Sequence, residues 1–161
     1  MPVGFALHES DAMPTATPLI SLLNDLRGRE FDLGEVSVTA EMIARYLEAV
    51  GDQTSAMLPC GEAPPSFCLA LRRGLTPQVQ LPADMFGVYG GHDLEFHRPI
   101  RAGERYRLTG RVTDVYEKMG RSGPLTIIAR EVIVRDSTGC EVARIVERQI
   151  VRRRPVEHTA P

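Results

Sequence analysis

The stretch 125-LTIIAREVIVRD-136 alternates between two sets of side chains along its length. The sets are Ile127, Ala129, Glu131, Ile133 and Arg135 on one side, against Ile128, Arg130, Val132 and Val134 on the other. A period of two, rich in β-branched residues, is typical of a β-strand whose two faces meet different surroundings. The stretch therefore predicts a long strand in a sheet.

Similar alternation extends to both sides of this stretch. The further predicted strands are 92–98, 104–118 and 141–153. Turn-forming residues separate them, at 101–104, at 120–124 and at 136–139. Successive strands with tight connections form an antiparallel meander, so we expect the C-terminal half of the chain to be one antiparallel sheet.

The N-terminal half has helical periodicity. Residues 19–26 form a short amphipathic segment, and 31–38 resemble a first strand. In the predicted helix 40–50, one face carries Ile43, Tyr46, Leu47 and Val50. Thr39 is a suitable N-cap and Gly51 a suitable C-terminal stop for this helix.

A second helix is predicted to begin at Pro64 and Pro65, because the first helical turn does not need the N–H groups that proline lacks. Residues 66–75 are apolar on nearly all sides at first, which is typical of a buried helix. We therefore predict an α+β fold, a curved antiparallel sheet wrapped around one central helix. It spans residues 18–154 as a single domain, with a flexible lead-in at 1–17 and a flexible tail at 155–161.

The composition is that of a soluble globular protein. Of the 161 residues, 43% are hydrophobic and 25% charged, with a net charge of −2. This balance favours neither nucleic acid nor a membrane as a partner. Three scattered cysteines predict neither a disulfide framework nor a metal site. We expect no cofactor, and a cytoplasmic location because the N-terminus has no basic signal-peptide region.

Three motifs carry a resemblance to a known family: Ala49–Asp52 at a helix end, Ala63–Phe67 at a helix start, and Arg98–Glu104 before a strand. With the strand pattern of 91–132, they resemble the hotdog fold of MaoC-like acyl-thioester dehydratases over residues 28–153. The branch that it resembles most serves as the N-terminal half of a double hotdog, or as one subunit of a heteromeric pair.

Active members of that family carry the motif Asp, any residue, Asn, Pro, any residue, His. Asp52 matches, whereas Thr54 and Ser55 replace Asn and Pro, and Met57 replaces the histidine. A thioether cannot exchange a proton near neutral pH. The resemblance thus implies that Asp52 is retained from the catalytic site, with Met57 lining the place of the missing base.

The resemblance also implies roles for other residues. The backbone N–H groups of Ser66 and Phe67 would hold the thioester carbonyl, and Arg98 would meet the phosphates of coenzyme A or of a carrier-protein arm. His92 is a candidate replacement for the absent imidazole. Simpler roles remain open for each: a turn aspartate, a helix cap, or a solvated arginine.

Three hypotheses follow. The first is a subunit of a (3R)-hydroxyacyl-thioester dehydratase or enoyl-thioester hydratase that pairs with a second hotdog chain carrying the complete Asp/His motif. Its substrate would be an acyl-CoA or an acyl-carrier-protein thioester. The second is a stand-alone dehydratase, a homodimer, that uses Asp52 with His92. The third is a non-catalytic hotdog protein that binds acyl thioesters.

Overall fold

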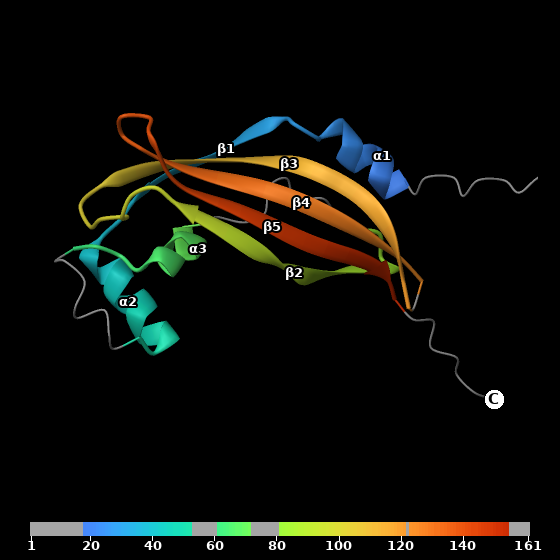
Figure 1. Cartoon of the computed structure of the whole chain (residues 1–161), viewed down its shortest axis with the longest axis horizontal. Coiled ribbons are helices and arrows are strands. Elements are labelled where there is room, and N and C mark those ends of the chain that lie inside the picture. The colour runs from blue at the N-terminus through green and yellow to red at the C-terminus, as the bar shows by residue number, and fades with distance from the viewer. Residues whose placement is uncertain (1–17, 53–60, 72–80, 122, 155–161) are drawn as a thin grey trace, which may run out of the picture.

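The structure is a computed structural model that describes residues 18–52, 61–71, 81–121 and 123–154. Within these ranges, five strands form one antiparallel sheet in the order β1-β3-β4-β5-β2 (Figure 1). The strands are β1 (Glu30–Ser37), β2 (Met85–Phe96), β3 (Arg105–Gly120), β4 (Gly123–Asp136) and β5 (Glu141–Arg153). The helices are α1 (Pro18–Asp25), α2 (Ala40–Val50), a 3-10 turn (Pro65–Phe67) and α3 (Cys68–Leu71).

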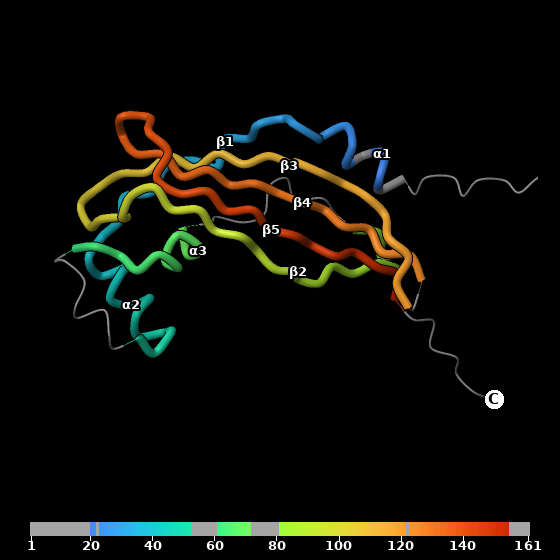
Figure 2. The backbone as a smooth tube through the Cα atoms, in the orientation of Figure 1, coloured from blue at the N-terminus to red at the C-terminus, as the bar shows by residue number. Residues whose placement is uncertain are grey.

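The central strands form the predicted meander, in which β4 pairs with both β3 and β5. β1 then pairs with β3, and β2 pairs with β5, so these two strands are the edges of the sheet. The backbone trace shows the long strands curving together, with α2 and α3 on the same side near one end (Figure 2). The predicted α+β architecture with a curved antiparallel sheet is confirmed.

The main hydrophobic core lies between this side of the sheet, called the inner face from here on, and helices α2 and α3. Phe67, Cys68 and Leu71 pack there against buried side chains of the central strands, including Tyr106 and Val134. The buried residues follow the alternation of the strands, because successive side chains point to opposite faces. The start of the central helix is therefore fixed by apolar burial.

A second cluster lies farther along the inner face. Leu23 of α1 is fully buried there against Val112, Val115 and Ile128. Ile128 and Val132 are an even number of residues apart on β4, which places both clusters on one face. The inner face is thus covered near both ends by helical segments from the N-terminal half.

The β2 strand begins at Met85, well before the predicted start at residue 92. Gly87 pairs with Val151 of β5, and the register then shifts between Tyr89 and His92, where Gly90 and Gly91 lie. A Cβ at Gly90 would lie 3.0 Å from the backbone oxygen of Arg148. The sequence prediction failed here because a residue that weakens an isolated strand allows two backbones to approach closely.

The predicted helix 40–50 and the predicted helix start after Pro64 are both present, but the burial of some of their side chains differs from the prediction. Thr39 caps α2 by accepting a hydrogen bond from the Met42 N–H, and Gly51 ends it with a φ of 66°. Val50, predicted to face the core, is the last residue of α2 and is 53% exposed. Ser66 and Ala70 are also exposed, so the described start of the second helix is buried on one side rather than all round.

The predicted tails at 1–17 and 155–161 lie outside the described residues, as do residues 72–75 of the second predicted helix. None of the helices in the described ranges is long and apolar enough to cross a membrane. Within the same ranges, no group of three His, Cys, Asp or Glu side chains is placed to hold a metal ion.

Candidate functional site

Asp52 lies directly behind the end of α2. The left-handed conformation of Gly51 turns the chain, and the Asp52 N–H then donates a hydrogen bond to the Leu47 carbonyl at 3.0 Å. This closure fixes the backbone of a half-buried aspartate at a helix end. Thr54, Ser55 and Met57, the positions where the sequence departs from the hydratase motif, lie outside the described residues.

A cavity of about 270 Å³ opens beside the start of the second helix. Two segments far apart in the sequence line it: Glu62, Ala63, Pro64 and Pro65 on one side, and Phe96, His97, Arg98, Pro99 and Ile100 on the other. The segments are joined by backbone hydrogen bonds from Ala63 N–H to Ile100 O at 2.8 Å, and from Ala102 N–H to Gly61 O at 2.7 Å. Two of the three resembling motifs therefore meet at one cavity.

The charged groups of this cavity are held by partners. Glu62 accepts hydrogen bonds from Arg101 through Nη2 at 2.7 Å and Nε at 3.2 Å, which raises the pKa of Arg101. Arg98 donates to Asp136 at 2.7 Å. Apolar walls carrying a carboxylate and cations suit an elongated ligand that has both apolar and polar parts.

His97 is the histidine that lines this cavity. Its Nε2 lies 3.4 Å from Glu141 Oε1. The pKa of Glu141 is lowered, chiefly by hydrogen bonds from Arg144 and to a smaller degree by His97. His97 directly precedes Arg98 and Pro99 in the sequence, and all three residues line the cavity.

The two predicted donors at the helix start have different surroundings. The Phe67 ring is buried and meets the Tyr46 ring edge to face, with centroids 5.4 Å apart. The Phe67 N–H donates to the Pro64 carbonyl at 2.9 Å, as the 3-10 turn requires. Ser66 is exposed next to Pro65, which lines the cavity. Phe67 is therefore a core residue, whereas Ser66 is exposed, and the predicted role of their N–H groups toward a thioester stays a prediction.

His92 is exposed on β2, directly opposite the buried Glu147 of β5. Its ring centroid is 5.8 Å from that of Tyr89. The described lining of the 270 Å³ cavity includes His97 and Arg98 but not His92. The structure thus brings Pro64, Pro65 and Arg98 together, while Asp52 and His92 are positioned by other elements.

A polar row on the inner face was not singled out from the sequence. Arg130 and Glu147 are buried and directly opposite in the pairing of β4 with β5, and Arg130 Nη2 donates to Gln149 Oε1 at 2.7 Å. The signal was present, because Arg130 interrupts an otherwise apolar set of alternating residues. A buried charge in such a set needs polar partners on neighbouring strands.

Comparison with known proteins identifies the family to which this chain belongs. A family model described as "FAS1-like, dehydratase domain region" matches residues 25–145, most of the chain. The chain belongs to this family. Its fold is the predicted hotdog, which it shares with MaoC-like dehydratases.

Two solved structures share the fold of this FAS1-like dehydratase region. The ChsH1–ChsH2 complex from Mycobacterium tuberculosis matches with a TM-score of 0.64 and 16% identity, over 88% of this chain and 94% of that chain. The MaoC-like dehydratase from Rhodospirillum rubrum matches with a TM-score of 0.58 and 23% identity, over 83% of this chain and 98% of that chain. At these identities the likeness concerns the fold.

One curated relative of this chain is mesaconyl-C(4)-CoA hydratase from Chloroflexus aurantiacus. It is 37% identical over 57 residues, which make up 35% of this chain. The match spans only 19% of that longer protein. The relative and this chain therefore share a segment of a hydratase rather than a whole enzyme.

Proposed function

We propose that this chain is one subunit of a (3R)-hydroxyacyl-thioester dehydratase or enoyl-thioester hydratase. The observation that carries the proposal is the pairing of a fixed aspartate, Asp52 behind α2, with Met57 at the position of the family's histidine. The cavity beside Pro64 and Pro65 supplies room for an acyl-thioester ligand.

The reaction explains why a second chain is required. Hydration removes a proton from water as its oxygen bonds to carbon 3 of a trans-2-enoyl thioester, and a proton is delivered to carbon 2. Asp52 would orient the water, but Met57 cannot accept or donate a proton. Losing one member of an acid–base pair typically slows a reaction by about 10²–10⁴-fold. In the proposed arrangement, a histidine of the partner chain supplies the missing step.

The partner is a second hotdog chain, and the two edges of the sheet differ in how well they suit one. β2 is 12 residues long and carries Val88 and Tyr89, which are 41% and 57% exposed. β1 is 8 residues long, is interrupted between Asp32 and Gly34, and bears several acidic side chains. A long edge with exposed apolar side chains favours strand addition, whereas a short, charged and bulged edge opposes it. We therefore place the partner along β2.

The ChsH1–ChsH2 structure is a complex of two differently named chains, and this chain matches 94% of one chain in that structure. That likeness supports an assembly of two hotdog chains here too.

The test is to measure hydration of crotonyl-CoA and longer enoyl-CoAs by the purified protein, alone and mixed with a second hotdog chain that has the complete motif. We expect robust turnover only in the mixture, reduced at least tenfold by Asp52→Asn. Glu48→Gln, an exposed change on α2, is the matched control and leaves the rate unchanged. Full activity of the single chain, insensitive to Asp52→Asn, would contradict the division of labour.

The stand-alone enzyme is the second candidate, and the position of His92 opposite Glu147 favours it. His92→Gln would then abolish activity in the absence of any other chain, whereas His97→Gln would not. Binding of acyl thioesters without turnover under every condition would instead identify a non-catalytic hotdog protein.

A further inference from the structure

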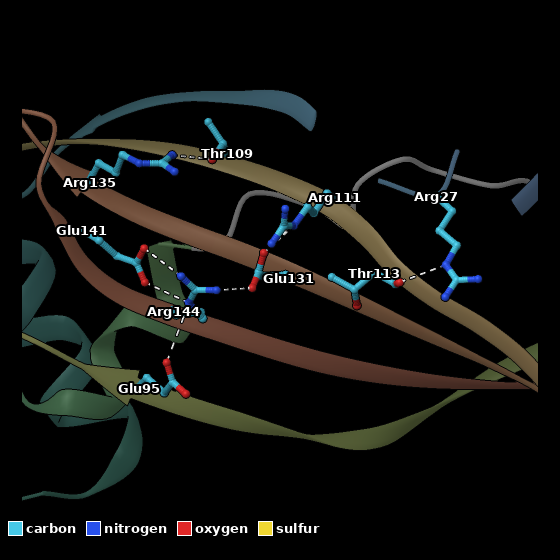
Figure 3. A network of polar contacts seen from close by, with 9 residues as sticks. All are labelled: Arg27, Glu95, Thr109, Arg111, Thr113, Glu131, Arg135, Glu141 and Arg144. Carbon is cyan, nitrogen blue, oxygen red and sulfur yellow. Dashed lines mark hydrogen bonds and ion pairs between the residues drawn. The ribbon is translucent and has the colours of Figure 1, made fainter. Parts of the chain in front are cut away.

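The arginines of the outer face of the sheet, opposite the helices, fall into two arrangements. In the first, Arg111 Nε and Arg144 Nη1 both donate to Glu131, each at 2.6 Å (Figure 3). The Glu131 side chain is only 6% exposed. Arg144 also contacts Glu141 at 2.9 Å, so this group of positive charges is balanced by carboxylates within the protein.

The second arrangement is different. Arg107 on β3 lies directly opposite Arg135 on β4 in the register of the sheet, and Arg105 lies two residues away on the same face. Like charges in directly opposed positions destabilise a sheet. Arg135 Nη1 donates to the Thr109 hydroxyl at 2.8 Å (Figure 3). Among the described residues, no carboxylate forms an ion pair with Arg135.

These arginines surround a hollow of about 370 Å³. Its described lining is Glu35, Arg105, Arg107, Arg135, Asp136, Ser137 and Gly139. The hollow lies where the edge strand β1, the start of β3 and the turn between β4 and β5 come together. It is large enough for a small anion.

The carboxylates near the hollow are already matched. Asp32 accepts from Arg107 at 2.6 Å, and Glu35 lies 3.9 Å from Arg105. Asp136 accepts from the Thr138 hydroxyl, from two backbone N–H groups of its turn and from Arg98, and these contacts lower its pKa. Each of these three acids therefore neutralises one arginine, and none of them neutralises the positive charge of Arg135.

We propose that this hollow binds a phosphate group, held by Arg135 and Arg107 with Arg105 beside it. Guanidinium groups match phosphate oxygens with paired, charge-assisted hydrogen bonds. A bound phosphate also relieves the repulsion between the two opposed arginines. Because the Asp32–Arg107 pair is more than half exposed, its bond exchanges easily with a ligand.

Adjoining hollows on the surface connect the 270 Å³ cavity with the arginine-lined hollow, and this connection indicates which molecule carries the phosphate. A third hollow shares Arg98 and Pro99 with the 270 Å³ cavity, and Asp136 and Ser137 with the arginine-lined hollow. A ligand seated in the cavity thus reaches the arginines through adjoining depressions. Resting on the proposed function, the ligand is the phosphate-bearing carrier of the acyl group, either coenzyme A or a phosphopantetheine arm.

The first experiment is direct binding by isothermal titration calorimetry, which needs no turnover. The probes are 3′,5′-ADP, pantetheine 4′-phosphate and inorganic phosphate, each with the whole protein. We expect binding that Arg135→Gln weakens by about tenfold or more, since charge-assisted hydrogen bonds are lost. The matched control is Arg148→Gln, an outer-face arginine paired with Asp93 at 2.7 Å, and it leaves binding unchanged.

The probes distinguish the two carriers: tighter binding of 3′,5′-ADP identifies coenzyme A, and tighter binding of pantetheine 4′-phosphate identifies a carrier-protein arm. Absence of binding by all three probes overturns the proposal, as does binding that Arg135→Gln and Arg148→Gln weaken equally.

The second experiment uses the active assembly and compares KM for an enoyl-CoA with KM for the matching N-acetylcysteamine thioester, which has no phosphate. Arg135→Gln raises the first KM severalfold and leaves the second KM and both kcat values unchanged. Equal effects on both substrates overturn the phosphate site. If the assembly shows no turnover, the proposed function fails while the binding result still decides the phosphate site.

Discussion

Arg130 and Glu131 are neighbours on β4, and both are buried, at 5% and 4% exposure, but they are buried in different ways. Arg130 points to the inner face, between the two apolar clusters, and bonds Gln149. Glu131 points to the outer face and is covered by Arg111 and Arg144. The inner face excludes water with a packed core, whereas the outer face does so with the stems of long charged side chains.

The largest expected difference between the faces concerns packing. Leu108→Ala on the inner face should lower the free energy of unfolding by about 2–5 kcal/mol, because it leaves a cavity in a packed core. Ile133→Ala on the outer face should cost clearly less, because flexible side chains around it relax into the space. Urea denaturation of both variants measures this. Equal losses would show that the outer face is packed as rigidly as the inner one.

The next effect concerns the buried carboxylate itself. Glu131→Gln should lower the free energy of unfolding by about 1–3 kcal/mol, since Arg111 and Arg144 lose a shared charged acceptor. Arg111→Gln should cost less, because Glu131 keeps Arg144. Thermal unfolding at low and high salt measures both, and the loss should change little with salt because buried ion pairs are screened much less than exposed ones. A stability unchanged by Glu131→Gln would mean that the cluster contributes nothing.

At one end of the inner face, Tyr106 makes a pH-dependent contribution to the free energy of unfolding. The fully buried Tyr106 donates to Glu104 at 2.6 Å and accepts from the Arg101 N–H at 2.8 Å. Burial and Glu104 raise the pKa of Tyr106 to about 12, above the unfolded value of 10.0. Its contribution is therefore complete below pH 10 and is lost as the pH rises towards 12.

Tyr106→Phe tests this contribution. It should lower the free energy of unfolding by about 0.5–1.5 kcal/mol at pH 8, the usual value of a hydrogen bond. The difference from the native protein should shrink between pH 10 and pH 12. Denaturation curves at several pH values measure it, with Tyr89→Phe, an exposed position, as the control. A difference that stays constant up to pH 12 would rule out titration of Tyr106.

The smallest expected effect is at an exposed ion pair on α2. Arg45 lies 2.7 Å from Glu41, one helical turn away, and both side chains are more than 70% exposed. Arg45→Gln should change the free energy of unfolding by about 0.5 kcal/mol or less, as is usual for such pairs. A loss of stability as large as that of Glu131→Gln would mean that burial beneath arginine side chains does not strengthen an ion pair.

Alternation and turn chemistry predicted the central strands and the α+β class, because both depend on neighbours in the sequence. The early start of β2 was missed because the need for glycine at residue 90 comes from Arg148 on another strand. Likewise, the sequence identified Pro64 and Pro65 as a helix start and Arg98 as a candidate for phosphate binding. It did not predict that the pairing of Ala63 with Ile100 brings them to one cavity, since that contact depends on the folded chain.

The sequence also partly predicted the surroundings of Arg130 and Glu131. Alternation assigns them to opposite sides of the sheet, and Arg130 stands out in an apolar set. Which groups would meet them depends on the register of β3, β4 and β5, and that register is fixed by the turns and by the bulge between Val112 and Asp114. The roles of Asp52 and His92 stay predictions, since they depend on residues beyond the described ranges and on a second chain.

The arginines over Glu131 have a further consequence at high protein concentration. Two broad sheets tend to associate through their open faces when the side chains there are short and apolar. Here, stacking would have to strip water from the half-exposed heads of Arg111 and Arg144 and separate them from the carboxylate that they share. The same ion pairs that shield Glu131 therefore oppose association between the outer faces of separate molecules.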